Sequence, residues 1–156
     1  MRALRMAVAL GFVAASELVG QGGRPLSVQG VRPLAFGLIL PGVPEVVLRT
    51  DPVKSGRFDL SGERFAQVEL TFTLPGQMIG PGGATMPLLF GSGDAGYSET
   101  QAIASQVAFD PNQRFVATLS RNGKGAVFLG GTVTPGAGQR AGSYTATITL
   151  TVAYLP

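Results

Sequence analysis

The sequence predicts an all-β protein, an antiparallel β-sandwich of about eight to ten strands rather than a closed barrel. Three observations support this fold class. Two segments alternate apolar and polar residues without a break, which is the pattern of a strand with one buried and one exposed face. The chain of 156 residues contains 23 glycines and 11 prolines, so turns are frequent, and only 13% of its residues are charged. No segment has the long 3.6-residue apolar period of an amphipathic helix.

The first 15 residues have the three parts of a cleaved export signal. Arg2 and Arg5 form a positive head, residues 6–13 are apolar, and small residues follow. This apolar run is shorter than the roughly 20 residues that a membrane span needs. We therefore expect cleavage after Ala15 or Ser16 and a secreted mature chain, in the periplasm or at the cell surface. The alternative is that this segment forms a buried N-terminal helix.

The sequence divides into three parts. Residues 1–15 are the expected signal peptide, residues 16–25 a flexible N-terminal lead-in, and residues 26–156 the β-sandwich domain. Loss of the signal removes two arginines and leaves ten basic and nine acidic residues, a formal net charge of +1. Nucleic-acid binding requires clustered Lys and Arg side chains, so no nucleic-acid partner is expected. The mature sequence has no second long apolar stretch, and no membrane insertion is expected.

Four strand regions are expected in the first half of the chain, at 25–42, 45–49, 56–60 and 67–74. In the first region Pro33 separates two apolar stretches, which predicts an edge strand followed by a more buried strand. The turn 51–56 separates the second region from the third. The fourth region alternates throughout and ends at Pro75-Gly76, with four side chains expected inside: Val68, Leu70, Phe72 and Leu74.

Five strand regions are expected in the second half, at 84–91, 104–109, 114–120, 126–134 and 144–154. The polar loop 91–101 is the one place where a short helical turn is expected. Asn122-Gly123 predicts a β-hairpin between the third and fourth of these regions, because this pair favours the tight turn that joins adjacent strands. The last region alternates over its whole length, with apolar residues at 144, 146, 148, 150, 152 and 154 expected inside and four threonines outside.

No catalytic, cofactor or metal site is predicted, and the protein is not expected to be an enzyme. The loop Gly91–Gly96 matches the glycine pattern of dinucleotide-binding loops, but such a site requires a following helix, and the sequence soon enters another strand. Residues 136–141 match a looser form and are also interpreted as a turn. The chain has no histidine and no cysteine, which excludes zinc sites of these ligands and Ser-His-Asp or Cys-His catalysis. Four aspartates are expected to form turns rather than bind calcium: Asp51, Asp59, Asp94 and Asp110.

Several segments resemble a known family. Four segments occur in this order along the chain: LAFGLILPG (34–42), FDLSG (58–62), TLP (73–75) and LGGTVT (129–134). They resemble the ordered landmarks of a bacterial secreted family, domain of unknown function 4402. The last of these leads into the final strand. The resemblance covers residues 25–155, and the order and spacing of the landmarks carry it. It implies an exported, immunoglobulin-like β domain.

The final strand is also similar to the last strand of spore-coat-U-like and other chaperone–usher pilins. Gly142, Tyr144, Val152 and Tyr154 take the places of the residues that mark that strand. The resemblance implies that a periplasmic chaperone engages the strand before subunits polymerise, through Tyr144, Ile148, Leu150, Val152 and Tyr154. The partners implied are other copies of this chain, a periplasmic chaperone and an usher. Leu155 and Pro156 extend past the pilin pattern, and the disulfide common in pilins cannot form without cysteine.

The function expected is structural, that of a non-enzymatic subunit of a bacterial surface fibre or pilus-like assembly. A sandwich that lacks one strand exposes an apolar groove and unpaired backbone groups, which a neighbour's extended segment can fill by strand addition. Leu26, Val28 and Gly30 point the same way in an extended chain and form a candidate donor segment, for which an ordinary edge strand of the same domain is the simpler alternative. The alternative function is a self-contained secreted module that binds a glycan or a protein.

Overall fold

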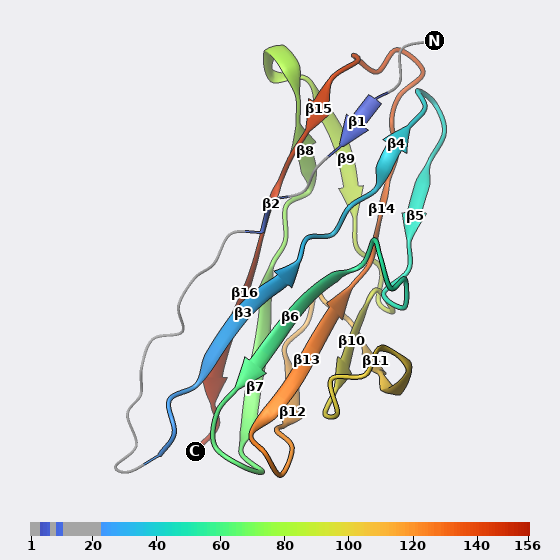
Figure 1. The fold of residues 1–156 in the computed structure, drawn as a ribbon. Helices are drawn as coiled ribbons and strands as arrows, with labels where there is room; N and C mark the ends of the chain where they lie inside the picture. Colours follow the sequence, from blue (N-terminus) through green and yellow to red (C-terminus); the bar gives the residue numbers. More distant parts are fainter. Residues whose placement is uncertain (1–3, 7–8, 11–22) are drawn as a thin grey trace.

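The computed structural model describes residues 4–6, 9–10 and 23–156, and Figure 1 shows an elongated molecule built from layers of strands. The strands are β1 (Leu4–Met6), β2 (Ala9–Leu10), β3 (Ser27–Arg32), β4 (Gly37–Ile39), β5 (Glu45–Val47), β6 (Gly56–Ser61), β7 (Gln67–Thr73), β8 (Gln77–Ile79), β9 (Thr85–Leu89), β10 (Ala95–Ser98), β11 (Val107–Phe109), β12 (Phe115–Thr118), β13 (Lys124–Leu129), β14 (Gly131–Val133), β15 (Ser143–Tyr144) and β16 (Thr147–Tyr154). The described residues contain two single-turn 3-10 helices, η1 (Pro81–Gly83) and η2 (Ile103–Ser105).

The strands form an antiparallel β-sandwich, which confirms the predicted fold class. One layer has the strand order β11-β10-β13-β6-β3, and the facing layer has the order β12-β7-β16-β2. Beyond them lie the sheets β5-β14-β9-β8 and β15-β1-β4. Every strand pair within residues 23–156 is antiparallel. The two parallel pairs, β1 with β15 and β2 with β16, both involve the segment predicted to be a signal peptide.

Several long strands bend and pass from one sheet to the next. The strands β4, β8, β14 and β16 each continue the preceding strand after a short interruption, so the fourteen strands of residues 23–156 form ten runs. The interruption between β13 and β14 lies at Gly130, where an added Cβ would overlap the carbonyl oxygen of Val47. Glycine is therefore required at this bend, because any side chain would displace β5.

The core confirms the alternation predicted for the two regular strands. In β7, Val68 and Leu70 are buried, and Phe72 packs against the core. Aromatic rings from both layers meet in the middle of the sandwich. The ring of Phe72 lies 5.8 Å from Phe58 and 6.4 Å from Phe109, and Phe109 stacks on Phe115 at 4.3 Å. Contacts of this kind contribute about 0.5–1.5 kcal/mol each beyond the area they bury.

The predicted hairpin at Asn122-Gly123 is wrong. A turn is present, since the N–H of Gly123 donates to the carbonyl of Ser120 at 2.8 Å. The strands on its two sides nevertheless do not pair with each other. The strand β12 pairs with β7, whereas β13 pairs with β6 and β10 in the other layer. The turn therefore connects the two layers. The reason is that both strands carry buried residues, such as Ala117 and Val127, which reach one core from opposite sides.

The strand β10 was expected to be part of a polar loop. It lies between β11 and β13, and all four of its residues are buried. The hydroxyl group of Tyr97 donates to the carbonyl of Thr118 at 2.7 Å, which links the two layers. The predicted helical turn lies just outside that loop, as η2.

Candidate strand-acceptor site

The apolar half of the final strand faces the domain's own core. Tyr144, Ile148, Leu150 and Val152 are each no more than 2% exposed, with β1 and β2 in place, and Tyr154 is half-buried. The alternation predicted from the sequence is therefore observed. A partner that engages this strand in the state shown would meet its backbone edge rather than these side chains.

Two tyrosine hydroxyl groups fix the ends of this strand. That of Tyr144 donates to the carbonyl of Arg140 at 2.7 Å and accepts from the side-chain amide of Gln139 at 2.7 Å. The ring of Tyr144 lies on Gly80, where an added Cβ would come within 2.5 Å of it. At the other end the hydroxyl group of Tyr154 donates to the carbonyl of Arg24 at 2.6 Å. These anchors hold the strand in one register.

The backbone edges of the final strand have different partners. One edge of β16 pairs with β7 from Thr149 to Tyr154. Along the opposite edge, β15 pairs with β1, and β16 pairs with β2 at Thr147 and Ile148. The other side of β1 pairs with β4. In Figure 1, β1 lies between β4 and β15, and β2 lies beside β16.

With β1 and β2 removed and the rest of the sandwich unchanged, a gap one strand wide would be left. Neighbouring strands lie about 4.8 Å apart, so β4 and β15, on either side of β1, are separated by roughly 10 Å in this arrangement, too far for hydrogen bonds between them. We call the space that β1 and β2 occupy, between β4 and β15 and along β16 at Thr147 and Ile148, the acceptor gap. Ile39 and Tyr144, which lie beside it on β4 and β15, are almost fully buried when β1 and β2 occupy it.

The candidate donor residues lie in the domain's own sheet. Val28 and Gly30 are part of β3 and pair with Leu60 and Phe58 of β6. Leu26, immediately before β3, packs with Val28 against the core. The segment thus occupies the position of the edge strand given above as the simpler alternative. Four residues separate β3 from β4, which borders the acceptor gap.

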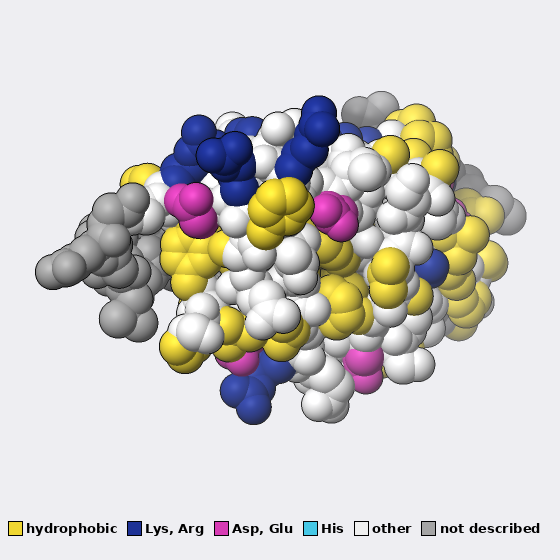
Figure 2. Space-filling view, turned by 90° about the horizontal axis from the view of Figure 1, so that it is seen from below, with side chains coloured by type: hydrophobic (Ala, Val, Ile, Leu, Met, Phe, Trp, Pro, Cys, Tyr) yellow, Lys and Arg dark blue, Asp and Glu magenta, His cyan; other side chains and the backbone are white. Residues whose placement is uncertain are grey.

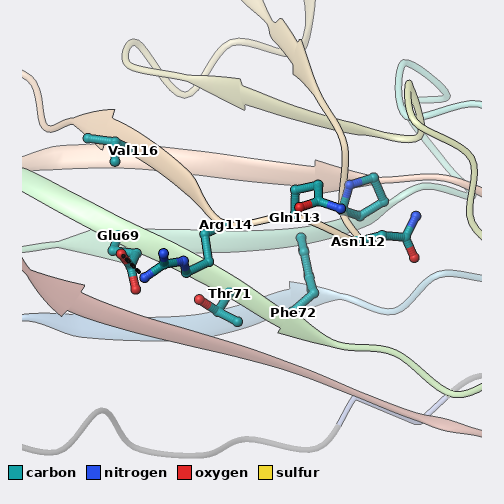
Figure 3. Close-up of a pocket in the computed structure, with 8 residues that line it drawn as sticks. Glu69, Thr71, Phe72, Asn112, Gln113, Arg114 and Val116 are labelled. Atoms are coloured by element: carbon teal, nitrogen blue, oxygen red, sulfur yellow. Dashed lines mark hydrogen bonds and ion pairs between the residues drawn. The ribbon is translucent and has the colours of Figure 1, made fainter.

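A hollow on the outer side of β7 offers little chemistry. It has a volume of about 480 Å³ and is lined mainly by side chains of β7 and of the segment that leads into β12. In Figure 3 Arg114 points to Glu69, with 3.4 Å between Nη1 and Oε2, so the two charges balance each other. Phe72 of β7 and Asn112 of the segment before β12 also line the hollow. No second carboxylate lines it that could serve as an acid–base partner.

The described part of the chain contains no group of three His, Cys, Asp or Glu residues placed to hold a metal ion. Nor do these residues include a helix with the length and apolarity that a membrane span requires. The turn predicted at Asp59 is wrong, because Asp59 lies within β6 and pairs with Arg57 at 2.8 Å. Asp51, another of the four aspartates expected to form turns, accepts the backbone N–H groups of Val53 and Lys54, both at 2.8 Å. These hydrogen bonds lower the pKa of Asp51, which is occupied in shaping its loop.

Residues 42–154 match the profile of one protein family, described as a domain of unknown function (DUF4402). The chain belongs to this family. The matched part begins after β4 and ends at the last residue of β16. The DUF4402 match includes β15 and β16, which form one side of the acceptor gap. The strand β4 and the strands that fill the gap, β1 and β2, precede the matched residues. No curated protein shows significant similarity to the chain.

The residues that sequence reasoning selected as a contact strand include β15 and β16, which border the acceptor gap, whereas β4 on its other side was not selected. Gly37–Ile39 carries no local sign of a role at an edge, because the pattern of LAFGLIL is that of any buried strand. The strands β1 and β2 were also missed, since an apolar run behind two arginines predicts a signal rather than a strand.

Proposed function

We propose that the mature chain is an exported, non-enzymatic structural subunit of a bacterial surface fibre, and that a strand from a neighbouring molecule fills its acceptor gap. One observation carries this proposal. The strands that fill the gap, β1 and β2, lie within the segment expected to be cleaved after Ala15 or Ser16. Cleavage would remove a strand from the sandwich and leave its place open.

An open gap is costly for the mature domain. The backbone groups of Gly37–Ile39 and Ser143–Tyr144 that now face β1 would lose their partners. Ile39 and Tyr144, both buried beside the gap, would lose part of their cover. An extended segment from another molecule restores both kinds of contact, as in recognition by strand addition. The proposed donors are a periplasmic chaperone first and a second subunit later, joined at an outer-membrane usher.

The likeness of the final strand to that of chaperone–usher pilins supports the same proposal. The strand that borders the gap is the one whose Gly142, Tyr144, Val152 and Tyr154 match the pilin pattern. Since β3 holds Leu26, Val28 and Gly30 in the domain's own sheet, a donor from this chain would have to come from elsewhere or leave β6.

A peptide experiment tests the proposal directly. Purified residues 16–156 should melt at a higher temperature when a peptide of residues 3–11 is added, because the peptide completes the sandwich. A control peptide with Met6→Pro and Ala9→Pro should have no effect, since proline cannot donate to the ladder. Surface extracts should show a ladder of bands without boiling and only monomer after boiling.

The contrary result is also measurable. If the amides of Gly37–Ile39 and Ser143–Tyr144 resist hydrogen exchange in residues 16–156 alone, the gap closes without a partner strand. The fibre proposal would be refuted by three results together: this protection, a melting temperature of residues 16–156 that neither peptide changes, and surface extracts without a ladder of bands.

A further inference from the structure

A second feature lies at the other end of the sandwich from β1, where three loops meet (Figure 1). Phe65, between β6 and β7, is 67% exposed and has a φ of 57°. Gln101, between β10 and β11, has a φ of 63°. These are the two residues other than glycine with positive φ in the described chain, and both line one hollow of about 520 Å³. A bulky residue in this conformation is a genuine outlier.

The side chain of Phe65 does not compensate for the strain in its backbone. A left-handed conformation costs a non-glycine residue about 1–2 kcal/mol, and glycine would remove that cost. An exposed phenylalanine ring adds no core packing. Strained residues of this kind cluster at functional sites, where the surrounding structure holds them.

The walls of the hollow are held rigidly. The N–H of Phe65 donates to the carbonyl of Ser120 at 3.2 Å, and the side-chain amide of Gln101 donates to the carbonyl of Gly125 at 3.2 Å. The N–H of Gly62 donates to the carbonyl of Gly123 at 2.8 Å, and a Cβ at Gly123 would overlap the carbonyl group of Gly62. A preformed site of this kind binds a ligand without a large cost of ordering.

The same end of the molecule carries excess positive charge. Four basic side chains lie there, none of them in an ion pair within the described residues: Arg24, Arg64, Arg121 and Lys124. Arg121 and Lys124 line the hollow itself, as does the carboxylate of Glu99. With Glu63 as the other acidic residue, these side chains carry four positive charges and two negative ones. Figure 2, which views this end, shows two groups of basic side chains along one side with an apolar side chain between them, acidic side chains beside both groups, and a further basic side chain on the opposite side.

We propose that this hollow binds an acidic sugar residue of a polysaccharide. One exposed aromatic ring suits the apolar face of a pyranose ring, and the polar groups around Phe65 suit its hydroxyl groups. These groups include the side chains of Thr100, Gln101 and Asn122. Arg121 and Lys124 provide the charge that pairs with a sugar carboxylate. The site lies away from the acceptor gap, so it does not depend on the fibre proposal.

The test uses the mature chain, with hexagalacturonate as the acidic probe and maltohexaose as the neutral control. Wild-type protein should bind the acidic oligosaccharide at least tenfold more tightly, by calorimetry or NMR titration. Raising the salt concentration should weaken that binding. Arg121→Gln with Lys124→Gln should reduce affinity for the acidic probe by tenfold or more. Equal affinity for both probes, or no binding of hexagalacturonate, would overturn the proposal.

Phe65→Gly separates binding from folding. This variant should melt at the same temperature as wild type or higher, because glycine accepts a φ of 57° without strain, while binding of hexagalacturonate should be lost. Val116→Ala, which removes methyl groups from an exposed side chain outside the hollow, should leave binding unchanged. Unchanged binding by Phe65→Gly, or a melting temperature several degrees lower, would show that Phe65 serves the fold rather than a ligand.

Discussion

Leu150→Ala tests the inward assignment of the final strand most directly. Leu150 lies in the middle of β16, opposite Phe72 of β7, and is 2% exposed. The substitution removes three buried carbon atoms, worth about 0.8 kcal/mol each in transfer free energy. The cavity left behind adds a further term, so the free energy of unfolding should fall by about 3–4 kcal/mol. For a domain of this size the melting temperature should then fall by roughly 10 °C.

The matched control is Thr151→Ala, at the next residue of the same strand. Thr151 is exposed and lies opposite Thr71 on the outer face. Loss of one cross-strand threonine pair should cost about 0.2–1 kcal/mol. Both variants are compared with wild type by thermal and urea denaturation followed by circular dichroism. If Leu150→Ala and Thr151→Ala melt within about 2 °C of each other, the assignment of the two faces is wrong.

Two further predictions concern pH and packing. Burial, with a contribution from Glu99, raises the pKa of Tyr97 to about 12. Between pH of about 10 and 12 the Tyr97 hydroxyl group therefore ionises in the unfolded chain before it does so in the folded one, and the free energy of unfolding should fall as pH rises through this range. In Tyr97→Phe this fall should be smaller. Gly80→Ala should lower the free energy of unfolding by about 1–3 kcal/mol, because the new methyl group meets the ring of Tyr144. Gly76→Ala, with no atom within 4 Å of the added Cβ, should change it by less than about 1 kcal/mol. Equal melting temperatures for the two alanine variants would contradict the contact.

The parts of the fold that could be predicted are those set by local sequence. The alternation of apolar and polar residues in β7 and β16 indicates which side chains of each strand face the core, and no other segment is needed to predict this. The strand β10 could not be predicted, because Ala-Gly-Tyr-Ser beside glycine, serine and aspartate has the composition of a loop. Its neighbours β11 and β13 make it a strand. Gly96 belongs there for a tertiary reason: an added Cβ would overlap the side chain of Gln106 and lie 2.9 Å from that of Arg49.

Strand partners could not be predicted. Asn122-Gly123 forms its turn, but which strands pair beyond it depends on β6 and β7, far away in sequence. The acceptor gap is of the same kind, since it exists only where residues 4–6, 37–39 and 143–144 come together. The hollow at Phe65 combines three loops, and no single loop carries a recognisable motif.

The place of β16 in its sheet has a consequence for how the chain folds as it is made. β7 pairs with β16 over six residues, and β16 supplies Ile148, Leu150 and Val152 to the core. A chain synthesised from its amino end therefore cannot complete this layer until residue 154 has been added. Pairings between distant segments also form slowly. If the chain is exported as proposed, this delay would keep the precursor unfolded while it passes through a narrow translocation channel, and the core would form only on the far side of the membrane.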